Sequence, residues 1–252
     1  MKKILLILTA GLLMATPACK KGENDPFLSL KSRKARLAGE YEFTFLESFN
    51  ETLVEGVFPY RTNIEIKIEG GVGTHSTAIT SEDGGIISGA KIKNIQVDRG
   101  EFIIDKDGSW EFTMNTTITW EEEGGGVNDH FEFTEIQTIT ESGDWEFLEG
   151  KSDGFKSKER VLFSKDSHQA FVQTNMKVVF IDGSSSDWPG EKHTVSHNGP
   201  TEFIYEIDGL KSKEMILKRP KDGAKVQGEG EDSPAPISLI TEGMVELHLK
   251  QL

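Results

Sequence analysis

The chain has 252 residues, a formal net charge of −14 at pH 7 and a single cysteine. Residues 39–252 carry 20 Lys and Arg against 40 Asp and Glu, so this region would repel the phosphates of nucleic acids, which require a basic surface. We therefore expect no nucleic-acid partner, and one cysteine excludes an intramolecular disulfide.

The N-terminus predicts export. Lys2 and Lys3 precede an apolar stretch at 4–14, which is too short to span a hydrocarbon core of about 30 Å, a thickness that needs roughly 20 apolar residues. The stretch has the length of a signal-peptide core, and Ala18 is the small residue that favours cleavage. We expect residues 1–18 to be a signal peptide, with Cys19 as the first residue of the mature chain.

The stretch "ATPAC" (15–19) resembles a bacterial lipoprotein signal, whose new N-terminal cysteine carries acyl chains on its thiol and its amine. The resemblance implies that Cys19 is lipidated and that residues 19–26 form a linker. Each buried methylene adds about 0.8 kcal/mol, so two or three chains would give a stable anchor. Lys20 in place of an acidic residue implies the outer membrane, on its periplasmic face or at the cell surface. The alternative is ordinary secretion with Cys19 as a free thiol.

A short basic helix is predicted over residues 27–38. Asp25 is a favourable N-cap, Pro26 fits the first helical position, and "FLSLKSRKARL" (27–37) contains no glycine or β-branched residue. The basic side chains could contact anionic lipid headgroups, or they could simply form the solvated face of the helix.

Residue 39 begins a different pattern, in which apolar and polar residues alternate. The alternation is clear in "YEFTF" (41–45), "IEIKI" (64–68), "WEFTM" (110–114) and "VELHL" (245–249). It predicts antiparallel strands with one buried and one solvated face. We expect one domain at 39–252, an all-β, up-and-down antiparallel barrel of about ten to twelve strands, because closure removes exposed sheet edges.

Glycines and polar runs predict the connections between these strands. Tight hairpins are expected at "DKDGS" (105–109) and "ESGD" (141–144), where Gly permits positive φ. Loops are expected at 121–129, 182–200 and 219–236, which are rich in Gly, Ser, Pro and charged residues.

The helix followed by "RLAGEYEF" (36–43) resembles the start of lipocalin-like domains, which carry Gly-x-Trp after a short helix. Gly39 and Tyr41 occupy those places. "CKKGENDPF" (19–27) followed by "GEY" is also similar to lipocalin-like lipoproteins of Gram-negative bacteria. The resemblance implies a barrel closed at one end by Tyr41 beside Gly39, with the other end opening on an apolar pocket.

Several groups of His, Asp and Glu have spacings that metal sites also use. We interpret them as solvated loop and turn residues, because none completes a known ligand pattern. No metal site, cofactor or catalytic residue is predicted. The groups are His193 and His197 with Asp187 and Glu191, then Asp105 and Asp107, then Glu121, Glu123 and Asp129.

Trp188, in "SSSDWPGE" (184–191), is the aromatic residue expected to be exposed, as a possible contact to a partner. The sequence therefore favours a non-enzymatic envelope lipoprotein that binds a small apolar ligand or a partner protein. The alternative is a structural or interaction subunit of an outer-membrane or cell-surface assembly that acts through its long loops.

Replacement of the anchoring residue tests the lipoprotein interpretation. Cys19→Ser should move the protein from the membrane fraction to the soluble periplasmic fraction, because no acyl chain can then be attached. Its circular dichroism spectrum should match that of the wild-type protein, since Cys19 precedes the predicted barrel. A Ser variant that still sediments with membranes after a high-salt wash would contradict the interpretation.

Overall fold

The computed structural model describes residues 33–55, 59–81, 83–124, 130–148, 159–211, 213–228 and 237–252. This part contains eleven antiparallel strands and one short helix, α2 (Arg33–Leu37). The predicted all-β fold is confirmed. The strands are β1 (Gly39–Glu55), β2 (Tyr60–Glu69), β3 (Val72–Ser81), β4 (Ile86–Ile104), β5 (Ser109–Glu123), β6 (His130–Leu148), β7 (Glu159–Val179), β8 (Ser185–Trp188), β9 (Lys192–Leu210), β10 (Glu214–Gly228) and β11 (Ile237–Gln251).

Helix α2 lies within the basic helix predicted at 27–38. The rest of that prediction, residues 27–32, lies outside the described residues, as do the signal peptide, Cys19 and the linker at 19–26.

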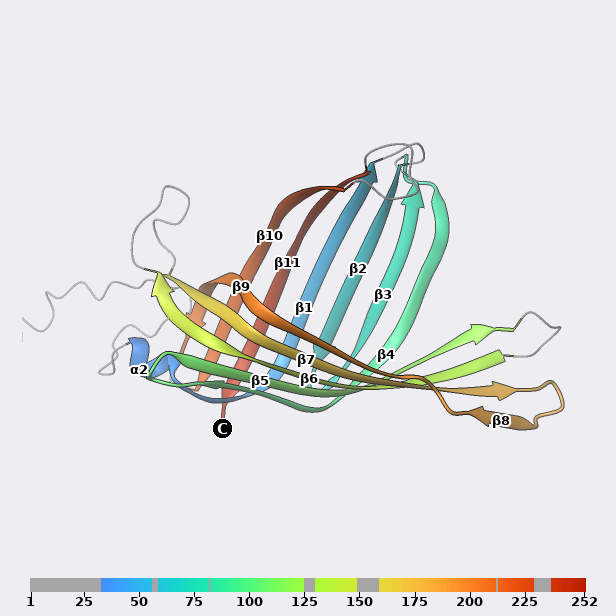
Figure 1. Cartoon of the computed structure of the whole chain (residues 1–252), viewed down its shortest axis with the longest axis horizontal. Helices are drawn as coiled ribbons and strands as arrows, with labels where there is room; N and C mark the ends of the chain where they lie inside the picture. The colour runs from blue at the N-terminus through green and yellow to red at the C-terminus, as the bar shows by residue number, and fades with distance from the viewer. Residues whose placement is uncertain are drawn as a thin grey trace, which may run out of the picture.

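The strands form a ring in which most neighbours are also consecutive in the chain. The order is β6-β5-β4-β3-β2-β1-β11-β10-β9-β7-β8, and a further pairing of β6 with β7 closes the sheet on itself (Figure 1). Among the described strands, the short β8 pairs only with the end of β7, beyond the residues of β7 that pair with β9. The ring is closed over only part of its length, because β10 from Arg219 onward pairs with β11 alone and β4 before Asn94 pairs with β3 alone. These two segments keep an unpaired strand edge.

One end of the ring is narrower than the other, because β1 pairs with two different strands along its length. Its first residues, Gly39–Glu42, pair with Glu101–Ile104 at the end of β4. From Phe45 onward β1 pairs with β2 instead. Eight strands thus close the narrow end: β1, β4, β5, β6, β7, β9, β10 and β11.

The β2–β3 hairpin lies between β1 and β4 where these two strands separate. Its turn residues Gly70 and Gly71 have φ angles of 59° and 83°, which glycine adopts without strain. The Gly70 N–H donates to the Thr44 carbonyl of β1 (3.0 Å), and the Val97 N–H of β4 donates to the Gly71 carbonyl (2.7 Å). Register shifts occur between Phe43 and Phe45 and between Val97 and Arg99, next to these contacts. Bulges of this kind bend a strand, so they let β1 and β4 diverge around the turn.

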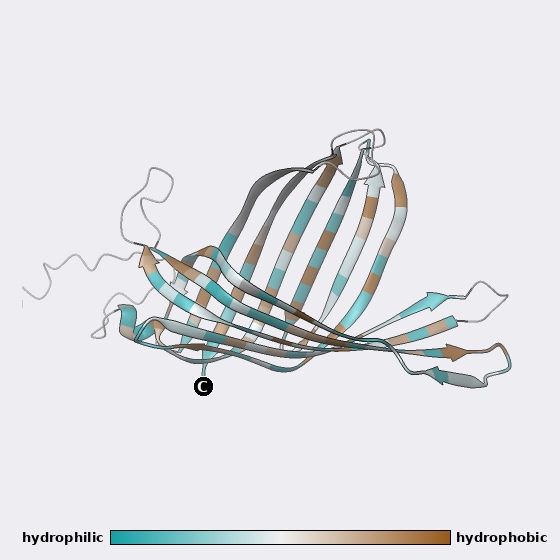
Figure 2. Ribbon diagram, viewed as in Figure 1, coloured by the Kyte–Doolittle hydropathy of each residue, from teal (hydrophilic) through white to brown (hydrophobic). Residues whose placement is uncertain are grey.

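The consequence is visible in the outline of the molecule. Strands β10, β11, β1, β2, β3 and the first part of β4 rise together on one side, whereas β5, β6, β7 and β8 run in another direction (Figure 1). Brown and teal bands alternate along individual strands, as expected for strands with one apolar face (Figure 2).

The main core fills the narrow end of the ring. Its buried residues come from α2 and from all eight strands of the narrow end: Leu37, Tyr41, Phe102, Ile104, Trp110, Trp145, Val161, Phe163, Ile207, Leu210, Met215, Leu217 and Leu249. A second, smaller cluster of Ile68, Ile95 and Ile118 packs where the β2–β3 hairpin joins the ring.

Helix α2 covers the narrow end. Leu37 is fully buried and Tyr41 is 2% exposed. The Tyr41 hydroxyl lies 2.8 Å from the Leu37 carbonyl oxygen and 2.9 Å from that of Arg36, so it binds the end of the helix. Arg36 donates from Nη1 to the Leu210 carbonyl oxygen at 2.7 Å, which ties α2 to β9.

One of the two predicted hairpins is correct and the other is wrong. Residues 105–108 join β4 to β5, with Gly108 at φ 110°. "ESGD" (141–144) instead lies inside β6, which continues to Leu148. Gly143 faces β7, where a Cβ atom would collide with the carbonyl oxygen of Ser164. The glycine allows close approach of two strands next to the register shift in β7, and it does not make a turn.

The three predicted loops are shorter than expected. Strand β5 extends to Glu123, β8 and the start of β9 occupy much of 182–200, and β10 extends to Gly228. All four residues of β8 are exposed, and so are residues 192–197 of β9. These strand segments extend beyond the core, so neither face needs apolar residues and the alternation that marks a strand is missing.

Truncation of Tyr41 tests the covering of the narrow end. Tyr41→Ala should lower the free energy of unfolding by about 3–5 kcal/mol, because a large buried aromatic side chain is lost. Tyr41→Phe should cost only about 1 kcal/mol, because it removes the hydroxyl alone. Chemical denaturation of each variant measures the change in the free energy of unfolding.

Trp188→Ala is the matched control, since the Trp188 side chain is 59% exposed. It should change stability by no more than about 0.5 kcal/mol. An equal effect of the Ala substitutions at Tyr41 and Trp188 would refute the packing described for the narrow end.

Candidate functional site

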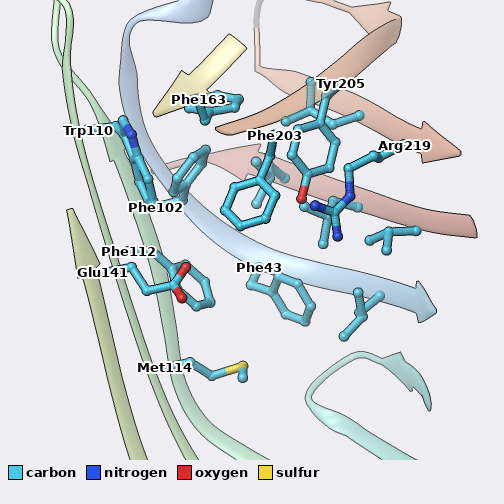
Figure 3. Close-up of a pocket in the computed structure, with 15 residues that line it drawn as sticks. Phe43, Phe102, Trp110, Phe112, Met114, Glu141, Phe163, Phe203, Tyr205 and Arg219 are labelled. Carbon is cyan, nitrogen blue, oxygen red and sulfur yellow. The ribbon is translucent and has the colours of Figure 1, made fainter. Parts of the chain in front are cut away.

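The ring encloses a cavity of about 320 Å³ (Figure 3). All eight strands of the narrow end contribute to its lining. Among the described residues that line it, only Glu141 and Arg219 carry a charge at neutral pH. The other lining residues are Phe43, Leu46, Phe102, Trp110, Phe112, Met114, Phe163, Phe203, Tyr205, Leu217, Val245, Leu247 and Leu249.

Three aromatic rings from different strands, Phe102, Trp110 and Phe163, form what we call the aromatic floor of the cavity. Their centroids lie 5.4–5.7 Å apart, and Trp110 meets both of the other rings edge to face. Such pairs contribute about 0.5–1.5 kcal/mol each beyond the area they bury. The Trp110 indole N–H also donates to the Ser164 carbonyl oxygen at 3.1 Å. The floor is therefore held in place without a ligand.

Glu141 reaches the cavity because β6 continues through the segment predicted as a turn. Its register partners are Phe112 on β5 and His168 on β7. The carboxylate accepts hydrogen bonds from Lys165 Nζ at 2.9 Å and His168 Nδ1 at 2.8 Å. All three side chains are largely buried, at 15–23% exposure. The Glu141 charge is thus already balanced by the Lys165 ammonium.

Arg219, on β10, lies on the other side of the cavity from Glu141 (Figure 3). Its guanidinium carbon is 4.7 Å from the centroid of Phe203 and 5.4 Å from that of Tyr205. These aromatic contacts orient the guanidinium group through cation–π attraction. Its Nε atom is buried and has no hydrogen-bond partner among the described residues.

The Tyr205 hydroxyl points toward the same part of the cavity as Arg219 (Figure 3). Burial raises the pKa of Tyr205, the Arg219 charge offsets this only partly, and the Glu141 charge raises the pKa further. Tyr205 therefore stays a neutral hydroxyl at physiological pH and can donate a hydrogen bond into the cavity.

The residues singled out from the sequence lie elsewhere. Gly39 and Tyr41 are at the narrow end below α2, and Tyr41 does not line the cavity. Trp188 is exposed on β8, at the far end of the molecule (Figure 1). Cys19 lies outside the described residues.

The groups with metal-like spacing are also dispersed. His193 and His197 are exposed on β9, and Glu191 accepts a hydrogen bond from His193 Nε2 at 3.0 Å. Asp107 accepts hydrogen bonds from the backbone N–H and hydroxyl of Ser109, as a turn residue does. Among the described residues, no three His, Cys, Asp or Glu side chains gather as a metal site. Asp129 lies outside that part of the chain.

Sequence reasoning missed both charged residues of the cavity. Glu141 was assigned to a turn and Arg219 to a loop. The signal that could have found them is residue parity: Glu141 has the parity of Ile139 and Trp145, and Arg219 continues the alternation of Met215 and Leu217. Uninterrupted strands through both segments would have placed the two side chains on the inner face.

In the part of the chain that the structure describes, no helix has the length and apolarity that crossing a membrane requires. Comparison with known proteins adds no assignment, because no family model, curated protein or solved structure matches the chain.

Proposed function

We propose that the protein is a non-enzymatic binding protein that holds a small apolar ligand in the ring cavity. The observation that supports this proposal most directly is the cavity itself. Its volume of about 320 Å³ falls within the range of about 300–1,000 Å³ that ligand sites occupy. An aromatic lining with few polar groups favours carbon-rich ligands, since small apolar cavities stay dry and take up apolar molecules.

We also propose that the ring is a lipocalin-like up-and-down barrel. The sequential strand order, the helix across one end and the buried Tyr41 beside Gly39 support this interpretation. In such barrels one end is closed and the ligand enters from the other. Here the cavity extends from the aromatic floor toward the end at which β1 and β4 diverge, which is consistent with entry from that side.

We further propose that a lipid anchor at Cys19 holds the protein at a membrane. Acylation of Cys19 would hold the ring at the outer membrane, on its periplasmic face or at the cell surface. The support for this location is the signal-like sequence at 1–19. A binding protein at a membrane surface is close to apolar molecules that scarcely dissolve in water, which gives such a cavity a supply of ligand.

A second candidate function is contact with a partner protein at the β7–β8 hairpin. Three large apolar side chains are exposed there: Phe180 (40%), Ile181 (68%) and Trp188 (59%). Exposed aromatic residues of this kind are common in protein interfaces. This candidate corresponds to an interaction subunit of an envelope assembly.

Filling the cavity separates the two candidates. The purified protein should bind N-phenyl-1-naphthylamine, an uncharged apolar fluorophore, saturably and with one site per chain. Leu46→Trp places a larger side chain on the lining of β1 and should weaken this binding by about tenfold or more. Met114→Trp fills the cavity from β5 and should act in the same way.

Phe49→Trp is the matched control, because Phe49 is also on β1 but is 42% exposed and does not line the cavity. Its affinity for the fluorophore should equal that of the wild-type protein. Thermal unfolding of each variant verifies that it is folded. A wild-type protein without saturable binding would refute the cavity as the functional site and would favour the β7–β8 hairpin.

A further inference from the structure

We infer that the ligand is a single-chain amphiphile with an anionic headgroup, a carboxylate or a phosphate, bound by Arg219. This inference rests on the proposed function, because it specifies the ligand of the same cavity. The apolar chain would lie against the aromatic floor, and the headgroup would bind the guanidinium group of Arg219 with help from the Tyr205 hydroxyl.

The Nε atom of Arg219 is the donor in the cavity that lacks an acceptor among the described residues. Lys218, the preceding residue, pairs with Asp208 at 3.2 Å and Glu246 at 3.3 Å. Arg219, by contrast, has no ion pair with any described residue, and its buried Nε has no hydrogen-bond partner there. A buried donor without an acceptor is costly, so an anionic group that reaches Arg219 gains a charge-assisted hydrogen bond and removes that cost.

The orientation of Arg219 favours a planar or tetrahedral oxyanion. Cation–π contacts with Phe203 and Tyr205 hold the guanidinium group in the cavity before a ligand arrives. A guanidinium group presents its N–H donors as a rigid fork that matches two oxygens of a carboxylate or phosphate. The neutral Tyr205 hydroxyl next to it adds a further donor.

The acidic residue of the cavity does not compete for Arg219. Glu141 already accepts from Lys165 and His168, on the other side of the cavity (Figure 3). Lys165 Nζ also lies 5.1 Å from the centroid of Phe203, the ring that Arg219 contacts as well. Since Lys165 balances the charge of Glu141, the positive charge of Arg219 gives the cavity a net positive charge. This charge disfavours a cationic headgroup.

The surrounding charge explains why a simple anion would not suffice. Residues 39–252 have twice as many acidic as basic residues, so free anions are repelled from most of the surface. A ligand needs the free energy of burying an apolar chain to overcome this repulsion. The site therefore selects molecules that combine a chain with an anionic group, rather than either part alone.

Displacement of N-phenyl-1-naphthylamine by four ligands with the same ten-carbon chain tests the inference. The ligands are decanoate, decyl phosphate, decanol and decyltrimethylammonium, each below its critical micelle concentration or solubility limit, with acetate as the chain-free anion. Decanoate and decyl phosphate should compete at least tenfold more strongly than decanol. Decyltrimethylammonium and acetate should compete least.

Two variants assign the preference to Arg219. Arg219→Gln should remove the preference of decanoate over decanol, with a loss of about 10–100-fold in decanoate affinity and little change for decanol. Lys250→Gln is the matched control, because it removes the same charge from an exposed position on the neighbouring strand, where the Lys250 side chain is 62% exposed. It should leave the preference intact.

The outcomes distinguish this inference from the proposed function. Equal binding of decanoate and decanol, or an unchanged preference in Arg219→Gln, would overturn the inference. Neither result would contradict the proposed binding of apolar ligands in the cavity. Stronger competition by decyltrimethylammonium would also overturn it. If neither the fluorophore nor any ten-carbon ligand binds, both the inference and the proposed function fail.

Discussion

The rest of the structure depends on the two hydrogen bonds that hold the Gly70–Gly71 turn between β1 and β4. They join the turn to Thr44 on one side and Val97 on the other. On the α2 side of the turn, β1 and β4 pair directly. On the other side of the turn, the β2–β3 hairpin separates these two strands. The ring is thus narrow where α2 covers it, and it opens beyond the turn, where β10 from Arg219 onward no longer pairs with β9. A ring of constant narrow width would be filled by its own side chains, as small barrels are.

The chemistry of the cavity follows from this geometry and from strand parity. Near α2 the inward positions are large and apolar, and they pack into a core that includes the aromatic floor. Farther along, the same parity brings Glu141 and Arg219 inward, where the strands begin to separate and side chains no longer meet across the ring. Glu141 is balanced within the protein, whereas Arg219 is positioned by aromatic rings and its buried Nε lacks an acceptor among the described residues. On this basis we propose that the interior holds an amphiphile.

Much of the fold could be predicted from the sequence because alternation is strong where the core is. The strands around Tyr41, Trp110 and Val245 were found in this way. Alternation is absent where strands extend beyond the core, so the sequence pattern predicts a loop at β8 and at the start of β9. The site was missed for a different reason: Gly143 next to Glu141 suggests a turn by composition, but its role is close packing against Ser164 on β7. That role depends on a contact between strands, which local sequence does not encode.

The central claim, that the ring holds a ligand in the native protein, is tested most directly by native mass spectrometry of the full chain purified from its own membranes in a mild, non-ionic detergent. The account predicts one non-covalent adduct per chain, released by collisional activation as a small anion, and its absence from the Leu46→Trp variant purified in parallel. Wild-type protein that carries no adduct, or one retained equally when the cavity is filled, would contradict the account.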